Sequence, residues 1–247
     1  MRAIVLTALL AVTACSSNSV RDSGITGSRS FDAAGFDAVS LEGPDSVIVR
    51  TGGAASVTAT GDTAVLDRLT VEVVNGILRI GREKSRLGMN WGSGSSATIT
   101  VTLPAIKAAS VAGSGDLSVD TVAVPAFESS VAGSGTLTVA ALKTDSVTVS
   151  LAGSGDATLA GTTRTAKYSV AASGDVHAGD LVATDADVSL AGSGGVTAGA
   201  TGHANVSIVG SGDVKILGGA TCSVTRIGSG DVRCAPAAGA APAPPPT

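Results

Sequence analysis

A four-residue motif recurs at a nearly constant interval through the second half of the sequence. It has the general form Gly-Ser-Gly-Asp, and its serine positions step by 20, 20, 19, 20, 18 and 18 residues. A period of this length predicts stacked supersecondary units, each burying its apolar side against the next. The seven copies occupy residues 113–116, 133–136, 153–156, 172–175, 192–195, 210–213 and 228–231.

The segments on either side of each motif have the pattern of strands. Around Ser114, apolar residues lie three positions before, three after and five after, at Val111, Leu117 and Val119, and most copies repeat these offsets. The offsets share a period of two, which is typical of a half-buried strand. Helix is disfavoured because β-branched residues abound and Gly makes up 33 of 247 residues.

We therefore predict an all-β fold, a parallel β-solenoid of about seven 18–20-residue coils with an irregular N-terminal β cap. In each corner, Gly supplies positive φ values while Ser and Asp bond to nearby amides. At about 4.8 Å per layer, seven coils make a rod about 34 Å long. A series of hairpins at the same period is the alternative, because turn spacing alone does not fix strand direction.

The solenoid domain is expected to span residues 31–234, with cap strands in 31–103 and the repeats in 104–234. Stretches 47–49, 57–59 and 69–74 have strand composition, and so do 77–80 and 96–103. Asn75-Gly76 lies between two of these stretches, which is a strong hairpin signal.

The first fourteen residues have the layout of a signal peptide, with Arg2 before an apolar run at 3–10. With Cys15 they resemble a bacterial lipoprotein signal, and that resemblance implies a lipid on Cys15. In lipoproteins of this kind, a residue other than Asp directly after the cysteine implies the outer membrane, and Ser16 stands at that position. An ordinary secretory signal is the alternative. Residues 15–30 are expected to form a flexible tether, and no later apolar run is long enough for a transmembrane helix.

Two cysteines remain after Cys15 is assigned to lipid. Cys222 and Cys234 lie seven before and five after Ser229, in the inward-facing register of the last repeat. In an oxidising compartment they are expected to form a disulfide that closes the last coil, with two buried free thiols as the alternative. Arg226, where most repeats have an apolar residue, also indicates an altered terminal coil. The Pro/Ala-rich residues 235–247 are expected to be a disordered tail.

Composition and spacing argue against several functions. A formal net charge of −4 and 2% aromatic residues disfavour a nucleic-acid binder. His177 and His203 fall at different offsets within their repeats, and no nucleophile motif is present. We therefore expect no catalytic residues and no cofactor. A β-helical carbohydrate-active enzyme is kept as the alternative, because parallel β-helices host such sites.

Two groups of residues are candidates for binding. Stacked repeats would align the motif aspartates, and calcium suits carboxylates, so Asp156, Asp175, Asp213 and Asp231 are a calcium hypothesis against simple solvated turn residues. Separately, the Gly/Ser-rich segment 82–96 carries Arg86, Met89 and Trp91. An exposed Trp beside basic residues is typical of a binding contact, so this segment is a candidate contact loop. Packing of Trp91 on the cap is the alternative.

The order of these features resembles a known bacterial family. The segments 36–39, 45–49 and 73–78, followed by the serial motif, are similar to the head GIN domain family of autotransporter-like adhesins. The resemblance implies an envelope-anchored β-helical protein with a structural or adhesive role toward an unknown envelope, matrix or protein ligand. A periplasmic partner of an envelope system is a further alternative. The sequence leaves undecided whether the domain faces the periplasm or the cell surface.

Overall fold

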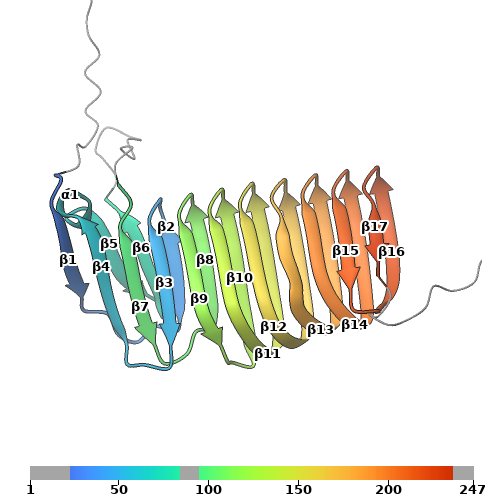
Figure 1. Cartoon of the computed structure of the whole chain (residues 1–247), viewed down its shortest axis with the longest axis horizontal. Helices are drawn as coiled ribbons and strands as arrows, with labels where there is room; N and C mark the ends of the chain where they lie inside the picture. The colour runs from blue at the N-terminus through green and yellow to red at the C-terminus, as the bar shows by residue number, and fades with distance from the viewer. Residues whose placement is uncertain (1–22, 84–94, 236–247) are drawn as a thin grey trace, which may run out of the picture.

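The computed structural model describes residues 23–83 and 95–235. Within these ranges the chain is nearly all strand, with one short helix, α1 (Thr63–Leu66). The strands stack along a single axis, so that β1 lies at one end of an elongated solenoid and β17 at the other (Figure 1). No helix in the described ranges is long and apolar enough to cross a membrane.

The repeats stack as parallel strands in register, which confirms the predicted solenoid and excludes serial hairpins there. Val131 lies opposite Leu151, and Leu151 lies opposite Val170. The repeat strands are β8 (Ala108–Gly113), β9 (Asp116–Val122), β10 (Ala126–Gly133), β11 (Thr136–Gly153), β12 (Asp156–Ala172), β13 (Val176–Gly192), β14 (Gly195–Gly210), β15 (Asp213–Leu217), β16 (Thr221–Gly228) and β17 (Val232–Cys234).

Each coil contributes one strand, or one half of a long strand, to each of two faces. The first face contains β8, β10 and β16, and the second contains β9, β15 and β17. The long strands β11 to β14 run through both faces. In β11, residues 136–142 pair with β9 in the second face, and residues 146–153 pair with β10 in the first.

The N-terminal end is closed by antiparallel strands. In the second face, β1 (Thr26–Phe31) pairs with β4 (Ser56–Asp62), which pairs with β7 (Thr98–Leu103). In the first face, β5 (Leu69–Val74) and β6 (Ile77–Arg82) form the predicted hairpin. Asn75 and Gly76 both have positive φ, 53° and 79°, as a tight hairpin turn requires.

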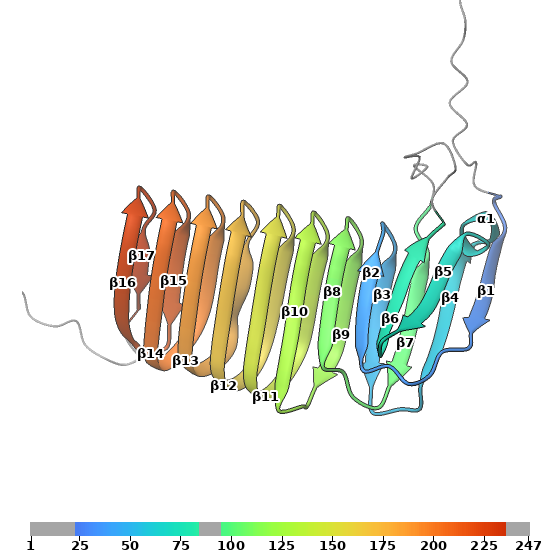
Figure 2. The same ribbon diagram turned by 180° about the vertical axis from the view of Figure 1, so that it is seen from behind.

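One coil lies outside chain order. Strands β2 (Ala38–Glu42) and β3 (Ser46–Thr51) insert between the β6–β7 coil and the β8–β9 coil, and all these pairings are parallel. Figure 2 shows β2 and β3 between those neighbours. Residues 43–46, Gly-Pro-Asp-Ser, turn the corner of this coil at the position that Gly-Ser-Gly-Asp occupies in the repeats.

A narrow apolar core fills the space between the faces. Inward positions form continuous columns, one of which contains Leu41, Val111, Val131, Leu151, Val170, Leu190 and Ile208, all buried. Tyr168 is fully buried on an inward position between Val149 and Val188. Its hydroxyl has no hydrogen-bond partner among the described residues.

The corners are held by a column of backbone hydrogen bonds with a fixed direction. Ser134 and Gly135 both donate their N–H to the Gly113 carbonyl, at 2.9 and 3.0 Å, and later corners repeat the pattern. A side chain on Gly135 would place its Cβ 2.1 Å from the Gly115 oxygen. The second Gly of the motif is therefore required by close stacking of the next corner.

In upstream corners the carbonyl of the second Gly accepts from the next coil, as Gly135 does from the N–H of Asp156 at 3.3 Å. At the last corner, no described coil follows to donate to the equivalent carbonyl of Gly230. Arg226, at the inward position where upstream coils have Leu, Val or Ile, donates from Nη1 to the Gly230 carbonyl at 2.8 Å. The guanidinium thus stands in for the backbone donor of a further coil. Charged side chains that face inward on an edge strand also oppose the addition of another strand.

Candidate functional site

A groove lies on the outer side of the first face, near the N-terminal end. It has a volume of about 630 Å³, within the range typical of ligand sites. Strands β5, β6, β2 and β8 contribute its walls. The lining residues are Glu42, Gly43, Pro44, Thr70, Glu72, Arg79, Gly81, Arg82, Ala112, Gly113 and Ser114.

The groove exists because its floor lacks side chains. Gly81 lies between Thr70 on β5 and Glu42 on β2 in the register of the first face. A Cβ at Gly81 would lie 3.0 Å from the Glu42 carbonyl oxygen, so the backbones pack closely there. The neighbouring corner adds only the small residues Ala112 and Gly113, and the longer Glu72, Arg79 and Glu42 side chains therefore stand above the floor.

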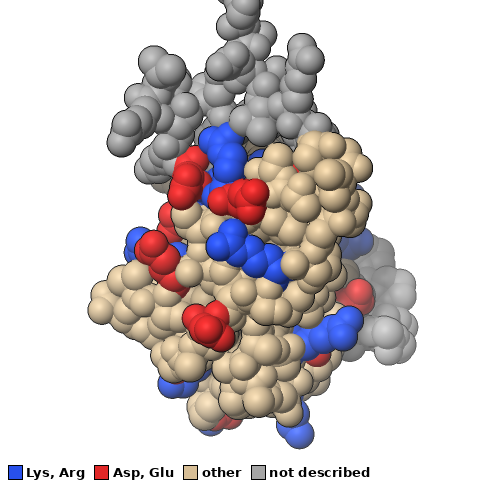
Figure 3. Space-filling model, turned by 90° about the vertical axis from the view of Figure 1, so that its left-hand side faces the viewer, with Lys and Arg blue, Asp and Glu red and all other residues tan. Residues whose placement is uncertain are grey.

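Among the described lining residues, carboxylates outnumber the available cations. Arg79 Nε lies 3.8 Å from Glu42 Oε1, and both side chains are about half exposed. Glu72 lies directly across from Arg79 in the hairpin, yet within the described residues no ion pair joins them. Side chains of both signs are interspersed at this end of the molecule (Figure 3).

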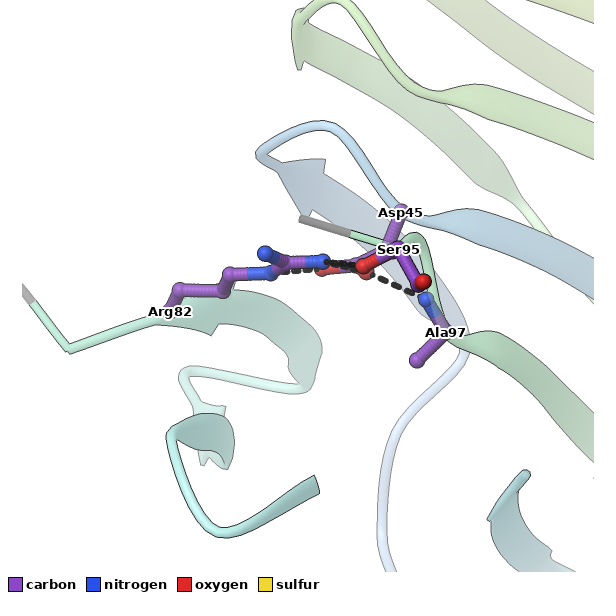
Figure 4. A network of polar contacts seen from close by, with 4 residues as sticks. All are labelled: Asp45, Arg82, Ser95 and Ala97. Carbon is purple, nitrogen blue, oxygen red and sulfur yellow. Dashed lines mark hydrogen bonds and ion pairs between the residues drawn. The ribbon is translucent and has the colours of Figure 1, made fainter. Parts of the chain in front are cut away.

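The second arginine of the groove is already committed to a buried partner. Arg82 donates from Nε and Nη2 to the two carboxylate oxygens of Asp45, at 2.9 and 2.5 Å. Asp45 is fully buried and also accepts the N–H of Ala97 at 2.8 Å, while Arg82 donates to the Ser95 carbonyl at 3.1 Å (Figure 4). Asp45 thereby joins the end of β6 to the chain just before β7.

Asp45 occupies a position that is Gly in the repeat corners. The Gly115 Cβ, if present, would meet the Asp45 carbonyl at 2.1 Å, so the two residues stack as equivalents. In the described part of the chain no Gly-Ser-Gly corner stacks on the other side of Asp45, where residues 83–97 separate β6 from β7 in the sequence. The side chain of Asp45 therefore does not meet the backbone of a stacked corner, as a side chain at the second Gly of a repeat corner would.

The motif aspartates align along the corner, as the repeat implied. Asp156 accepts the N–H of Asp175 at 3.0 Å, and Asp175 accepts that of Gly195 at 2.6 Å. Asp213 likewise accepts the N–H of Asp231, at 2.8 Å. Each of these three carboxylates thus bonds to the following coil. In the described ranges no group of three or more His, Cys, Asp or Glu side chains is arranged to hold a metal ion.

The predicted disulfide is confirmed. Cys222 on β16 and Cys234 on β17 are joined, with their Cα atoms 6.6 Å apart. The bond links the two faces at the last coil. Cys234 is exposed and Cys222 half-buried, because no described coil covers their inward-facing side.

Several other candidates are placed apart or fall outside the described ranges. His177 and His203 are exposed on different faces, on β13 and β14. Phe36, Phe127 and Tyr168 are buried, so none of them offers an exposed aromatic platform. Cys15 and the contact-loop residues Arg86, Met89 and Trp91 lie outside the described residues.

The roles of Asp45 and Arg82 and the presence of the groove were not predicted from the sequence. A signal for the corner was present: Leu41, Val47 and Val49 stand at the repeat offsets from Pro44. The signal was hidden because Pro44 and Asp45 replace Ser and Gly. No local pattern brings Glu42, Glu72 and Arg79 together, since their proximity depends on the insertion of β2 beside β6.

Solved structures share this fold. A "putative adhesin" from Bacteroides fragilis NCTC 9343 has a TM-score of 0.79 and 22% identity, covering 87% of this chain and 100% of that one. A "putative lipid binding protein" from Parabacteroides distasonis ATCC 8503 has a TM-score of 0.70 and 24% identity, covering 87% and 99%. A "putative adhesin" from the same strain has a TM-score of 0.67 and 20% identity, again covering 87% and 99%.

No curated protein matches the chain. A family model does match, over residues 35–220, and its description is "Putative auto-transporter adhesin, head GIN domain". The match includes the out-of-order coil, the groove and all but the last of the repeat corners. The chain belongs to this head GIN domain family.

Proposed function

We propose that this chain is a lipid-anchored protein of the bacterial cell envelope with a non-catalytic, adhesive or structural role. The observation that carries the proposal is the regularity of the solenoid's outer surface. On the first face, outward serines form one column in register, composed of Ser40, Ser110, Ser130, Ser150, Ser169, Ser189 and Ser207. A long rod with repetitive small polar groups suits contact with an extended surface.

The arrangement of chemical groups favours binding over catalysis. The aligned carboxylates Asp156, Asp175 and Asp213 are engaged in backbone hydrogen bonds between coils. The carbohydrate-active alternative calls for two free carboxylates beside an aromatic platform. Phe36, Phe127 and Tyr168 are buried, and the guanidinium of Arg29 lies over the half-buried Phe31, 5.1 Å from its ring centroid. The family description and the two structures called adhesins agree with a binding role.

The anchor in this proposal is Cys15. The signal-like segment ends at this residue, and a tether would lead from it to the solenoid. The solenoid begins at Thr26, the first residue of β1, so the predicted tether of residues 15–30 is too long at its C-terminal end. Several acyl chains would hold the protein firmly, since each buried CH₂ contributes about 0.8 kcal/mol. Ser16 favours the outer membrane. An adhesive role requires the solenoid to face outward, whereas a periplasmic partner role requires it to face inward.

Detergent-phase partition of the expressed chain tests the anchor. Wild type should enter the detergent phase, Cys15→Ala should remain in the aqueous phase, and Ser16→Ala, which keeps the cysteine, should behave as wild type. Mass spectrometry of the mature N-terminus should find acyl groups on Cys15. A Cys15→Ala protein that partitions like wild type would refute lipid anchoring at this residue.

A further inference from the structure

The charge balance of the groove defines the kind of group it can hold. Glu42 and Glu72 face one available guanidinium, that of Arg79. Arg82 does not change this balance, because its side chain is only 10% exposed and its charge is matched by Asp45. Among the described residues, the groove therefore carries one uncompensated negative charge.

The geometry of the groove suits the insertion of a partner's side chain better than contact with a flat surface. Gly81 contributes no side chain to its floor, and Thr70 and Ser114 are among its lining residues. A volume of about 630 Å³ admits a few peptide residues. Glu72 can meet a cation, and Arg79 can then meet a peptide carbonyl or remain with Glu42.

We propose that this groove binds a basic segment of a protein partner by receiving a lysine or arginine side chain between Glu42 and Glu72. The inference rests on the proposed binding role, for which it names a site and a partner chemistry. The chain's net charge of −4 also favours encounter with basic partners. Because the pairs are partly exposed, the contact should be weak and sensitive to salt.

Calorimetric titration of the purified full chain tests the proposal with three capped tripeptides, Lys₃, Glu₃ and Gly₃. Lys₃ should bind, and Glu₃ and Gly₃ should not. Glu42→Gln with Glu72→Gln should weaken Lys₃ binding at least about tenfold, the effect of losing roughly 1.4 kcal/mol. Glu128→Gln, an exposed carboxylate on the same face outside the groove, should leave binding unchanged.

A second pair of variants distinguishes binding inside the groove from nonspecific attraction to the negative charge of the protein. Ala112→Trp fills the groove and should abolish binding, whereas Ala152→Trp, in the same outward column two coils further along, should not. Circular dichroism should show all variants folded. Equal binding of Lys₃ to both tryptophan variants, preference for Glu₃, or no binding of any peptide would overturn the proposal. If Lys₃ does not bind while the wild-type chain is still anchored and adhesive, the groove inference fails and the proposed function stands.

Discussion

The carboxylate of Asp45 and the guanidinium of Arg82 form a buried two-point contact across 37 positions of sequence. Asp45 is fully buried and Arg82 only 10% exposed. The pair stands where the repeat corners end and where β6 leads toward β7. The pair therefore joins the out-of-order coil to the end of β6 and to the chain before β7, on the side of Asp45 where no described Gly-Ser-Gly corner is stacked.

Removing one member of this pair should strongly destabilise the fold. Asp45→Ala or Arg82→Ala leaves an uncompensated buried charge, and each should lower the free energy of unfolding by about 3–5 kcal/mol. Urea denaturation measures the loss, and the double variant should cost less than the sum of the singles. The exposed pair Lys107–Asp37 provides the control, since Lys107→Ala should cost no more than about 1 kcal/mol. Additive losses at Asp45 and Arg82 would contradict direct coupling.

The stacked corners should not tolerate a methyl group at the second Gly of the motif. In Gly135→Ala the new Cβ would meet the Gly115 oxygen at 2.1 Å, so the coils must separate. We expect a loss of about 3 kcal/mol or more in the free energy of unfolding. Ser134→Ala, one residue away and exposed, should change it by no more than about 0.5 kcal/mol. Similar stability of the two variants would mean that the corners are not closely stacked.

Tyr168→Phe should stabilise the protein. Its hydroxyl is buried without a partner, and an unsatisfied buried group costs about 1–3 kcal/mol. Burial also raises the pKa of Tyr168 above its usual value of 10.0. The unfolded chain therefore ionises at this residue first, and as the pH rises above 10 the wild type should lose more stability than Tyr168→Phe. Urea denaturation across this pH range measures both effects, and a less stable Phe variant would indicate a hydrogen bond to the hydroxyl.

Loss of the disulfide should loosen the last coil before the rest of the solenoid. The bond closes a loop with a sequence separation of 12, so Cys222→Ser with Cys234→Ser should cost about 2–3 kcal/mol. Hydrogen exchange should speed up at the amides of β16 and β17 and remain unchanged in β8 and β9. Uniform acceleration along the whole solenoid would show that its coils unfold together and that the bond does not act locally.

The repeat made most of the fold predictable from sequence. Alternating apolar residues at fixed offsets from each motif specify which side faces inward, and Gly at the corners permits close stacking. Cys222 and Cys234 were predictable as a pair because both fall in the inward register. The Asn75-Gly76 hairpin was predictable because its turn chemistry is local.

The out-of-order coil could not be read in the same way. Its position depends on the pairing of β2 with β6 and β8, which come later in the chain, and no local signal encodes that choice. The groove follows from this insertion, since it brings Glu42 beside Gly81. The regular part of the molecule was therefore predictable from the sequence, whereas the place where the coils depart from chain order was not.

Protease shaving of intact cells tests most directly the adhesive form of the proposal, which requires the anchored solenoid to face outward. An epitope at Thr247 reports cleavage, a periplasmic protein reports leakage, and Cys15→Ala provides the unanchored comparison. The account predicts loss of the epitope from wild-type cells while the periplasmic protein stays intact. An epitope protected until the outer membrane is opened would contradict an adhesive role and favour a periplasmic partner instead.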